Sequence, residues 1–322
     1  MVSVLSTLRR LVWSDDERRP RAPVRLVVGV VVVVVALVGT VFVVQSLRAS
    51  VPLVLAESVP FVVLVSVTTG VTSAVAVAVV GRFVDRRRFA DFGFGVDRDW
   101  WVDLGFGFGL GAALMTLVFL LELALGWVVV TGTFAPRGSF LSGFLAVLAL
   151  FLVVGVQEEL LARGYLLTNV CEGLRGWLGD RGSTAVAVVV SSAVFGALHL
   201  GNPNATLVST LSISFAGVML AVGYVLTDEL AIPIGLHISW NLFQGAVYGF
   251  PVSGLGIDVA VVAVSQRGPD LWTGGAFGPE AGLLGIAAIA LGTLLTVGYV
   301  HARYRFLAVH PSLTTPDLRW RD

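Results

Sequence analysis

The stretch FLVVGVQEELLARGYLL, residues 151–167, begins as an unbroken apolar run and then places Glu158 and Glu159 side by side, with Arg163 one helical turn further on. An ionised side chain at the centre of a bilayer costs about 2.5–3.5 kcal/mol on insertion scales, so carboxylates within a span usually have a function. On a helix, Glu159 and Arg163 share a face and can pair, whereas Glu158 is rotated by about 100° and can face a different cavity. The stretch predicts a membrane helix that carries an available carboxylate.

The composition of the whole chain agrees with a membrane location. Of its 322 residues, 56% are hydrophobic and only 13% are charged, and the mean hydropathy is +0.90. In lipid, helices satisfy all their own backbone polar groups, so we predict an all-α polytopic membrane protein with the lipid bilayer around it. The formal net charge is zero, which gives no indication of a nucleic-acid partner.

Apolar runs of roughly 20 residues predict individual spans, and the chain has about eight. They cover residues 26–47, 59–81, 102–130, 139–163, 184–200, 205–227, 230–249 and 281–303. We therefore expect a cytoplasmic N-terminal segment at 1–25, a transmembrane domain at 26–306 and a cytoplasmic tail at 307–322. A Gly-rich loop of undefined role, Phe250 to Glu280, separates the last two spans.

Arginine sets the predicted orientation in a cell membrane. With a cytoplasmic N-terminus, eighteen of the 21 basic residues, all arginine, fall on the inner side, and only Arg48, Arg137 and Arg267 fall outside. This bias follows the positive-inside rule and predicts that both termini are cytoplasmic.

Two further features of the spans have structural interpretations. The stretch GFGFGLG, residues 105–111, lacks the strand–turn–helix context of a nucleotide loop, and its GxxxG spacing favours close packing of helices. Glu122 has no partner within its own helix, and we expect it to hydrogen-bond to a neighbouring helix.

Two later spans carry paired polar or aromatic residues four positions apart. FGALH places Phe195 and His199 on one helical face, and HISWN does the same for His237 and Asn241. Together with the glutamates of residues 151–167, a Glu with a His could deprotonate water, and a His with an Asn could donate hydrogen bonds to an oxyanion.

A metal site is the alternative chemistry for the same residues. Glu158, His199 and His237 could hold Zn²⁺ with one position open, although the HExxH pattern of soluble zinc proteases is absent. A zinc-bound His237 could not donate a hydrogen bond from the same nitrogen. We favour a site that requires no tightly bound metal, with zinc as the alternative cofactor.

Depth in the membrane opposes this site if every span is straight. At 1.5 Å per residue, Glu158 would lie about 28 Å along its helix from the outer side, and His199 about 22 Å along its helix from the inner side. The residues can meet only if helices tilt or break, or if residues 163–180 dip back into the membrane. We expect a cavity within the membrane, nearer its cytoplasmic side.

The three patterns together resemble a known family. EELLAR, FGALH and HISWN match EExxxR, FxxxH and HxxxN in the order found in the CPBP family of intramembrane proteases, also called the Abi or CAAX-protease-like family, over roughly residues 141–250. Ala162 departs from the aromatic residue that the family often has before its Arg. The resemblance implies a multi-helix (metallo)endopeptidase in which Glu158 and His199 activate water and His237 and Asn241 stabilise the oxyanion. Glu159, Arg163 and Phe195 would support this catalytic set.

The resemblance also implies a substrate class. Peptide bonds of membrane-associated or prenyl-CAAX-like proteins would be hydrolysed. Two other functions stay open: a non-catalytic membrane scaffold or immunity protein of the same fold, and a solute or proton carrier. A carrier favours inverted repeats, and the sequence shows no repeat of useful period.

Overall fold

The computed structural model describes residues 9–50, 59–136 and 139–318, and it is a helical bundle. Its main helices are α2 (Ala22–Ser50), α4 (Val59–Val80), α5 (Arg98–Ala124), α6 (Phe140–Glu159), α7 (Thr168–Leu198), α8 (Leu207–Thr227), α9 (Ala231–Leu242) and α11 (Leu283–Tyr304). The chain is an all-α polytopic membrane protein, as predicted, and each of the eight predicted spans contains a helix.

Six helical runs in the described chain are long and apolar enough to cross a membrane. One of them, Phe140–Gly201, has 62 residues and includes two of the predicted spans. The short helix α9 has only 12 residues, and it continues through a π-helical turn, η5 (Phe243–Val247). The structure has six such runs where eight spans were predicted, because the run Phe140–Gly201 contains two predicted spans and α9 is too short to be counted as one.

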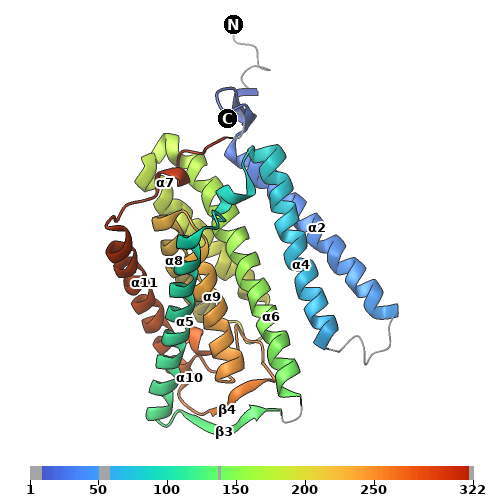
Figure 1. Cartoon of the computed structure of the whole chain (residues 1–322), viewed down its shortest axis with the longest axis vertical. Helices are drawn as coiled ribbons and strands as arrows, with labels where there is room; N and C mark the ends of the chain where they lie inside the picture. Colours follow the sequence, from blue (N-terminus) through green and yellow to red (C-terminus); the bar gives the residue numbers. More distant parts are fainter. Residues whose placement is uncertain (1–8, 51–58, 137–138, 319–322) are drawn as a thin grey trace.

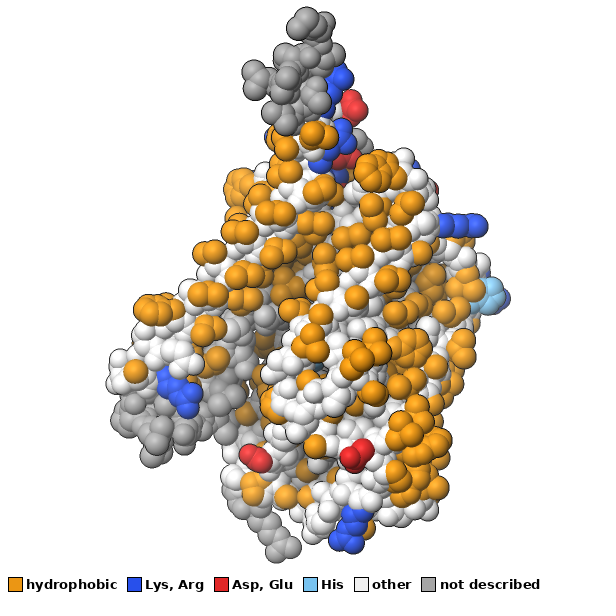
Figure 2. All heavy atoms as spheres, turned by 180° about the vertical axis from the view of Figure 1, so that it is seen from behind, with side chains coloured by type: hydrophobic (Ala, Val, Ile, Leu, Met, Phe, Trp, Pro, Cys, Tyr) orange, Lys and Arg blue, Asp and Glu red, His pale blue; other side chains and the backbone are white. Residues whose placement is uncertain are grey.

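Helices α5, α6, α8, α9 and α11 run roughly along the long axis of the molecule, and α2 and α4 are inclined to them (Figure 1). Helix α2 begins at the end of the molecule where α11 ends. Strands β3 (Val128–Ala135) and β4 (Ala260–Gln266) and helix α10 (Asp270–Thr273) lie at the opposite end. The face seen in Figure 2 is covered by hydrophobic side chains, with most charged side chains toward the two ends. This distribution is typical of a bundle that is surrounded by lipid.

The predicted third span, 102–130, is too long at its end. Helix α5 stops at Ala124, and Gly126 follows with a φ of 71°, a left-handed conformation that ends helices. The next residues form β3, which pairs antiparallel with β4, with Val128 opposite Gln266 and Ala135 opposite Ala260. Glu122 accepts a hydrogen bond at 3.1 Å from Gln266 of this sheet rather than from a neighbouring helix.

The Gly-rich stretch in α5 packs against α9, as predicted. A Cβ atom on Gly107 would lie 2.2 Å from the carbonyl oxygen of Ile232, and one on Gly111 would lie 2.6 Å from that of Leu236. Only glycine permits this approach of two helix backbones. The contact fixes the height of α9 in the bundle, and α9 carries His237 and Asn241.

The position of the FGALH pattern depends on a long helix that reverses. Helix α6 continues without a break through the π-helical segment η3 (Leu160–Leu167) into α7. The chain then turns inside α7 at Gly179, where φ is 65° and ψ is 179°, a conformation open essentially to glycine alone. The second half of α7 returns toward the centre of the bundle and ends in a short 3₁₀ turn, η4 (His199–Gly201).

The start of α2 is held by buried ion pairs. Arg25 lies 3.0 Å from Asp85, which follows α4, and 2.8 Å from Glu172 of α7, and all three side chains are almost fully buried. The preceding two-residue strands β1 (Trp13–Ser14) and β2 (Arg19–Pro20) pair with each other. These contacts fix one end of α2 against α4 and α7.

Candidate active site

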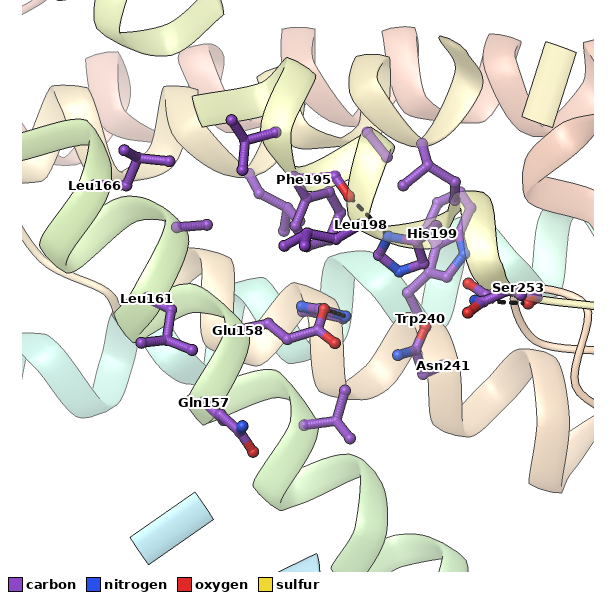
Figure 3. Close-up of a pocket in the computed structure, with 18 of the residues that line it drawn as sticks. Gln157, Glu158, Leu161, Leu166, Phe195, Leu198, His199, Trp240, Asn241 and Ser253 are labelled. Carbon is purple, nitrogen blue, oxygen red and sulfur yellow. Dashed lines mark hydrogen bonds and ion pairs between the residues drawn. The ribbon is translucent and has the colours of Figure 1, made fainter. Parts of the chain in front are cut away.

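Three separate helices bring the predicted catalytic residues to one cavity of about 560 Å³. Glu158 comes from the end of α6, His199 from the end of α7, and His237 and Asn241 from α9. Figure 3 shows Glu158, His199 and Asn241 around the same space, with Phe195 above them. Residues that are 83 positions apart along the chain are thus neighbours in one site.

Straight spans were expected to keep Glu158 and His199 at different depths in the membrane, and the reversal at Gly179 shows why this expectation is wrong. Beyond Glu158, the helix continues for about 20 residues to the turn, and the return helix covers nearly the same number before His199. At 1.5 Å per residue, the outward and return paths are both roughly 30 Å long, so the two residues reach the same level. Residues 163–180 do not dip back toward the site, because most of them extend the helix away from it.

Glu159 and Arg163 form the predicted buried pair. The Nη1 atom of Arg163 donates a hydrogen bond of 2.8 Å to Oε1 of Glu159, and both side chains are 0% exposed. Arg163 also donates to the carbonyl oxygen of Gly217 in α8, at 3.1 Å, and its guanidinium lies 4.4 Å from the ring centre of Phe195. Arg163 therefore joins α6, α7 and α8 behind the cavity.

Both imidazoles are oriented through their Nδ1 atoms. In His199, Nδ1 lies 2.8 Å from the carbonyl oxygen of Phe195, and in His237 it lies 2.9 Å from Oε1 of Glu159. A carbonyl or an ionised carboxylate can only accept a hydrogen bond, so we assign the proton to Nδ1 in each ring. The Nε2 atoms are then left for the chemistry of the cavity.

Glu158 differs from Glu159 in its surroundings. Its side chain is 35% exposed, and its Oε2 lies 3.8 Å from Nε2 of His237, an ion-pair distance that is too long for a hydrogen bond. Among the described residues, Oε2 of Glu158 and Oε2 of Glu159 are buried without a hydrogen-bond partner. A buried carboxylate oxygen with no partner is costly, so the cavity can accommodate a polar group at this point.

Most of the remaining cavity wall is apolar. One wall is formed by a face of α2 with Leu26, Val30, Val33 and Val34, and others by Leu161, Leu166, Val194 and Leu198. The sequence did not predict that α2 lines the cavity, because nothing in its valine-rich run distinguishes a cavity-lining face. The site therefore has a polar end at Glu158 and the imidazoles and a long apolar region beside it.

Several polar residues of the cavity wall, Gln157 among them, were not predicted from the sequence. Asn202 follows His199 in the turn GNPNAT, and Ser253 and Glu280 come from the segment between α9 and α11. The available sequence signal for Glu280 was that it is the single glutamate of the Gly-rich loop 250–280. The structure shows that it is only 3% exposed.

The described residues around the cavity do not form a metal centre. Within the described ranges, no group of three His, Cys, Asp or Glu side chains is close enough to hold a metal ion. The predicted zinc set of Glu158, His199 and His237 therefore does not fit a metal in this arrangement. Whether activity requires metal stays a prediction.

The central part of the chain matches the model of a known protein family. Residues 140–243, about a third of the sequence, match the family model described as type II CAAX prenyl endopeptidase Rce1-like. Neither the curated proteins nor the solved structures gave a match. The matched residues contain Glu158, Glu159, Arg163, Phe195, His199, His237 and Asn241. This match supports the assignment of residues 140–243 to the CPBP family of CAAX-type membrane proteases.

Proposed function

We propose that the chain is an intramembrane endopeptidase in which Glu158 and His199 activate the attacking water. The observation that carries this proposal is the fixed orientation of both imidazoles around one cavity beside a partly exposed carboxylate. With its proton on Nδ1, His199 presents the lone pair of Nε2 and can accept a proton. Glu158 has a free oxygen for the same water.

The reaction is hydrolysis without a covalent intermediate. Water loses a proton to Glu158 or His199 while its oxygen bonds to the peptide carbonyl carbon. The C–N bond then breaks, and the same proton passes to the leaving amine. No other reactant is needed.

His237 and Asn241 would stabilise the oxyanion. They lie one helical turn apart on α9 and both line the cavity. To donate from Nε2, His237 must carry protons on both nitrogens, and Glu159 at 2.9 Å is the counter-charge for that form. Removing one such donor typically lowers kcat by about 10²–10³.

The apolar region of the cavity favours a substrate with a hydrophobic segment next to the cleaved bond. A membrane-associated protein or a prenyl-CAAX-like C-terminus meets this requirement, because both carry apolar groups that prefer lipid to water. The alternative is a non-catalytic scaffold of the same fold, for which Arg163 and Glu159 would serve stability only.

The test uses purified protein in lipid nanodiscs with a farnesylated CAAX peptide, its unprenylated counterpart and an apolar transmembrane peptide. We expect cleavage by the wild type, at least 10³-fold slower cleavage by Glu158→Gln and His199→Ala, and normal cleavage by Glu122→Gln. Glu122 is a matched control, because it is a buried membrane carboxylate that does not line the cavity. Equal rates for Glu158→Gln and the wild type would reject the proposed mechanism.

A further inference from the structure

Glu280 lies outside the residues that match the family model, yet it reaches the cavity wall from just before α11, in the 3₁₀ turn η6 (Pro279–Ala281). Its carboxylate accepts hydrogen bonds from two directions. Oε1 accepts from the backbone N–H of Ser253 at 2.5 Å, and Oε2 accepts from the side-chain amide of Gln244. The hydroxyl of Ser212 in α8 donates to the backbone carbonyl of the same residue.

One of these directions leads to His199. The backbone oxygen of Ser253 accepts a hydrogen bond of 3.0 Å from the side-chain amide of Asn202. The backbone N–H of Asn202 in turn donates to the carbonyl of His199, at 3.1 Å. Ser253 holds a left-handed backbone conformation, with a φ of 49°, which is uncommon for a residue other than glycine and persists only where its surroundings fix it.

The other direction leads to Asn241. Gln244 lies in η5, three residues after Asn241, and is fully buried. Its amide also donates to the carbonyl of Pro251, at 2.5 Å. The end of α9 and the turn after His199 are therefore joined through one carboxylate.

The surrounding chain leaves room for this carboxylate. Gly278 has a φ of 123°, and a Cβ there would lie 2.6 Å from Oε2 of Glu280 and 2.8 Å from the amide nitrogen of Gln244. A side chain at this position would separate the pair. Burial raises the pKa of Glu280 to about 7, while the hydrogen bonds from Ser253 and Gln244 lower it.

We propose that Glu280 is a positioning residue of the hydrolytic site, and that its carboxylate holds the turn carrying His199 at a fixed distance from the helix end carrying Asn241. The proposal rests on the proposed function, because it assigns the water-activating group to one side of this tether and an oxyanion donor to the other. Displacement of a catalytic group by about 1 Å can cost about 10²-fold in rate, so a tether of this kind acts on kcat.

The decisive variant is Glu280→Gln, which keeps the size of the side chain but replaces one acceptor oxygen with an NH₂ group. That group would meet the N–H of Ser253 or the amide of Gln244, so one of the two bonds is lost. The matched control is Glu122→Gln, because Glu122 is also a buried carboxylate that accepts from a glutamine amide, and it does not line the cavity. We expect Glu280→Gln to lower kcat about 10- to 100-fold with KM within about threefold of the wild type.

Two readouts separate positioning from general stability. Asn202→Ala breaks the same tether at another point, so the double variant with Glu280→Gln should lose no more kcat than the worse single variant. Hydrogen–deuterium exchange at residues 199–206, well below the melting temperature, should be faster in Glu280→Gln and unchanged in Glu122→Gln.

Unchanged exchange in Glu280→Gln, or additive losses of kcat in the double variant, would overturn the proposal. A wild-type protein that cleaves no peptide would reject the proposed function and with it the catalytic role of Glu280. The exchange measurement would still decide whether the tether exists, so the two failures can be told apart.

Discussion

Replacing Arg163 with leucine tests how the buried charge pair supports the site. The variant places a shorter, apolar side chain at this position and leaves the carboxylate of Glu159, which is 0% exposed, without its cationic partner. Breaking a buried ion pair from one side typically costs about 3–5 kcal/mol. The change also removes the stacking of the guanidinium on Phe195, a contact worth about 2 kcal/mol when desolvated.

His237 still donates to Glu159 in this variant, so part of the carboxylate remains satisfied. We therefore expect a total loss of about 3–5 kcal/mol in the free energy of unfolding rather than the full sum. The assay is equilibrium unfolding in bicelles, followed by the fluorescence of Trp240, which lines the cavity, with the other tryptophans replaced by phenylalanine in every protein compared.

The matched control is Arg175→Leu. Arg175 pairs with Asp180 at 2.9 Å, but the two side chains are 44% and 57% exposed, and such surface pairs contribute about 0–1 kcal/mol. A second variant, Arg163→Leu with Glu159→Gln, removes the stranded charge and keeps an acceptor for His237, so it should regain stability relative to Arg163→Leu. If Arg163→Leu costs no more than Arg175→Leu, the ion pair does not support the site.

Three further predictions concern the reversal, the topology and pH. Gly179→Val should lower the free energy of unfolding by about 1–3 kcal/mol and should also lower kcat, because valine resists a φ of 65°. The control Gly176→Ala, in open space within the helix, should change neither, and equal melting temperatures and rates for the two variants would refute this prediction. In a Cys171→Ser, Arg267→Cys variant, the new thiol at this exposed position should react with an impermeant thiol reagent on intact cells. Reaction only after permeabilisation would reverse the predicted orientation. Burial raises the pKa of Asp228 and of Glu229 to about 7, so their folded state binds protons more tightly and the melting temperature should fall as pH rises from about 4 to 7; a double Asp228→Asn, Glu229→Gln variant with the same slope would refute the assignment.

The membrane helices of the fold could be predicted from the sequence, because the thickness of the bilayer determines how long an apolar span must be. Valine and leucine runs such as 26–47 indicate helices without any knowledge of their neighbours. The strand pairing of β3 with β4 could not be predicted, because it joins segments more than 120 residues apart and each strand is short. The end of α5 was predicted too late in the sequence, because the apolar stretch VVVTGTFA is compatible with either a helix or a strand.

The candidate catalytic residues could be predicted as residue types and spacings, but their arrangement in space could not. Arg163 pairs with Glu159 because both lie on one helix, and local spacing fixes that contact. The meeting of Glu158 with His199 depends on where the long helix reverses, and a single glycine among 37 gives no signal of its own. Glu280 was missed because its contacts with Ser253 and Gln244 arise only when a long loop folds back onto α9.

The central claim is that the cavity around Glu158 hydrolyses peptide bonds of membrane proteins. The most direct test compares the peptide ends in the membrane proteome of cells lacking the protein and of the same cells expressing the wild type, Glu158→Gln or Glu122→Gln at equal levels. We predict new C-terminal or internal ends with the wild type and with Glu122→Gln, and none with Glu158→Gln. The same new ends with Glu158→Gln, or no difference between the wild type and cells lacking the protein, would contradict the claim.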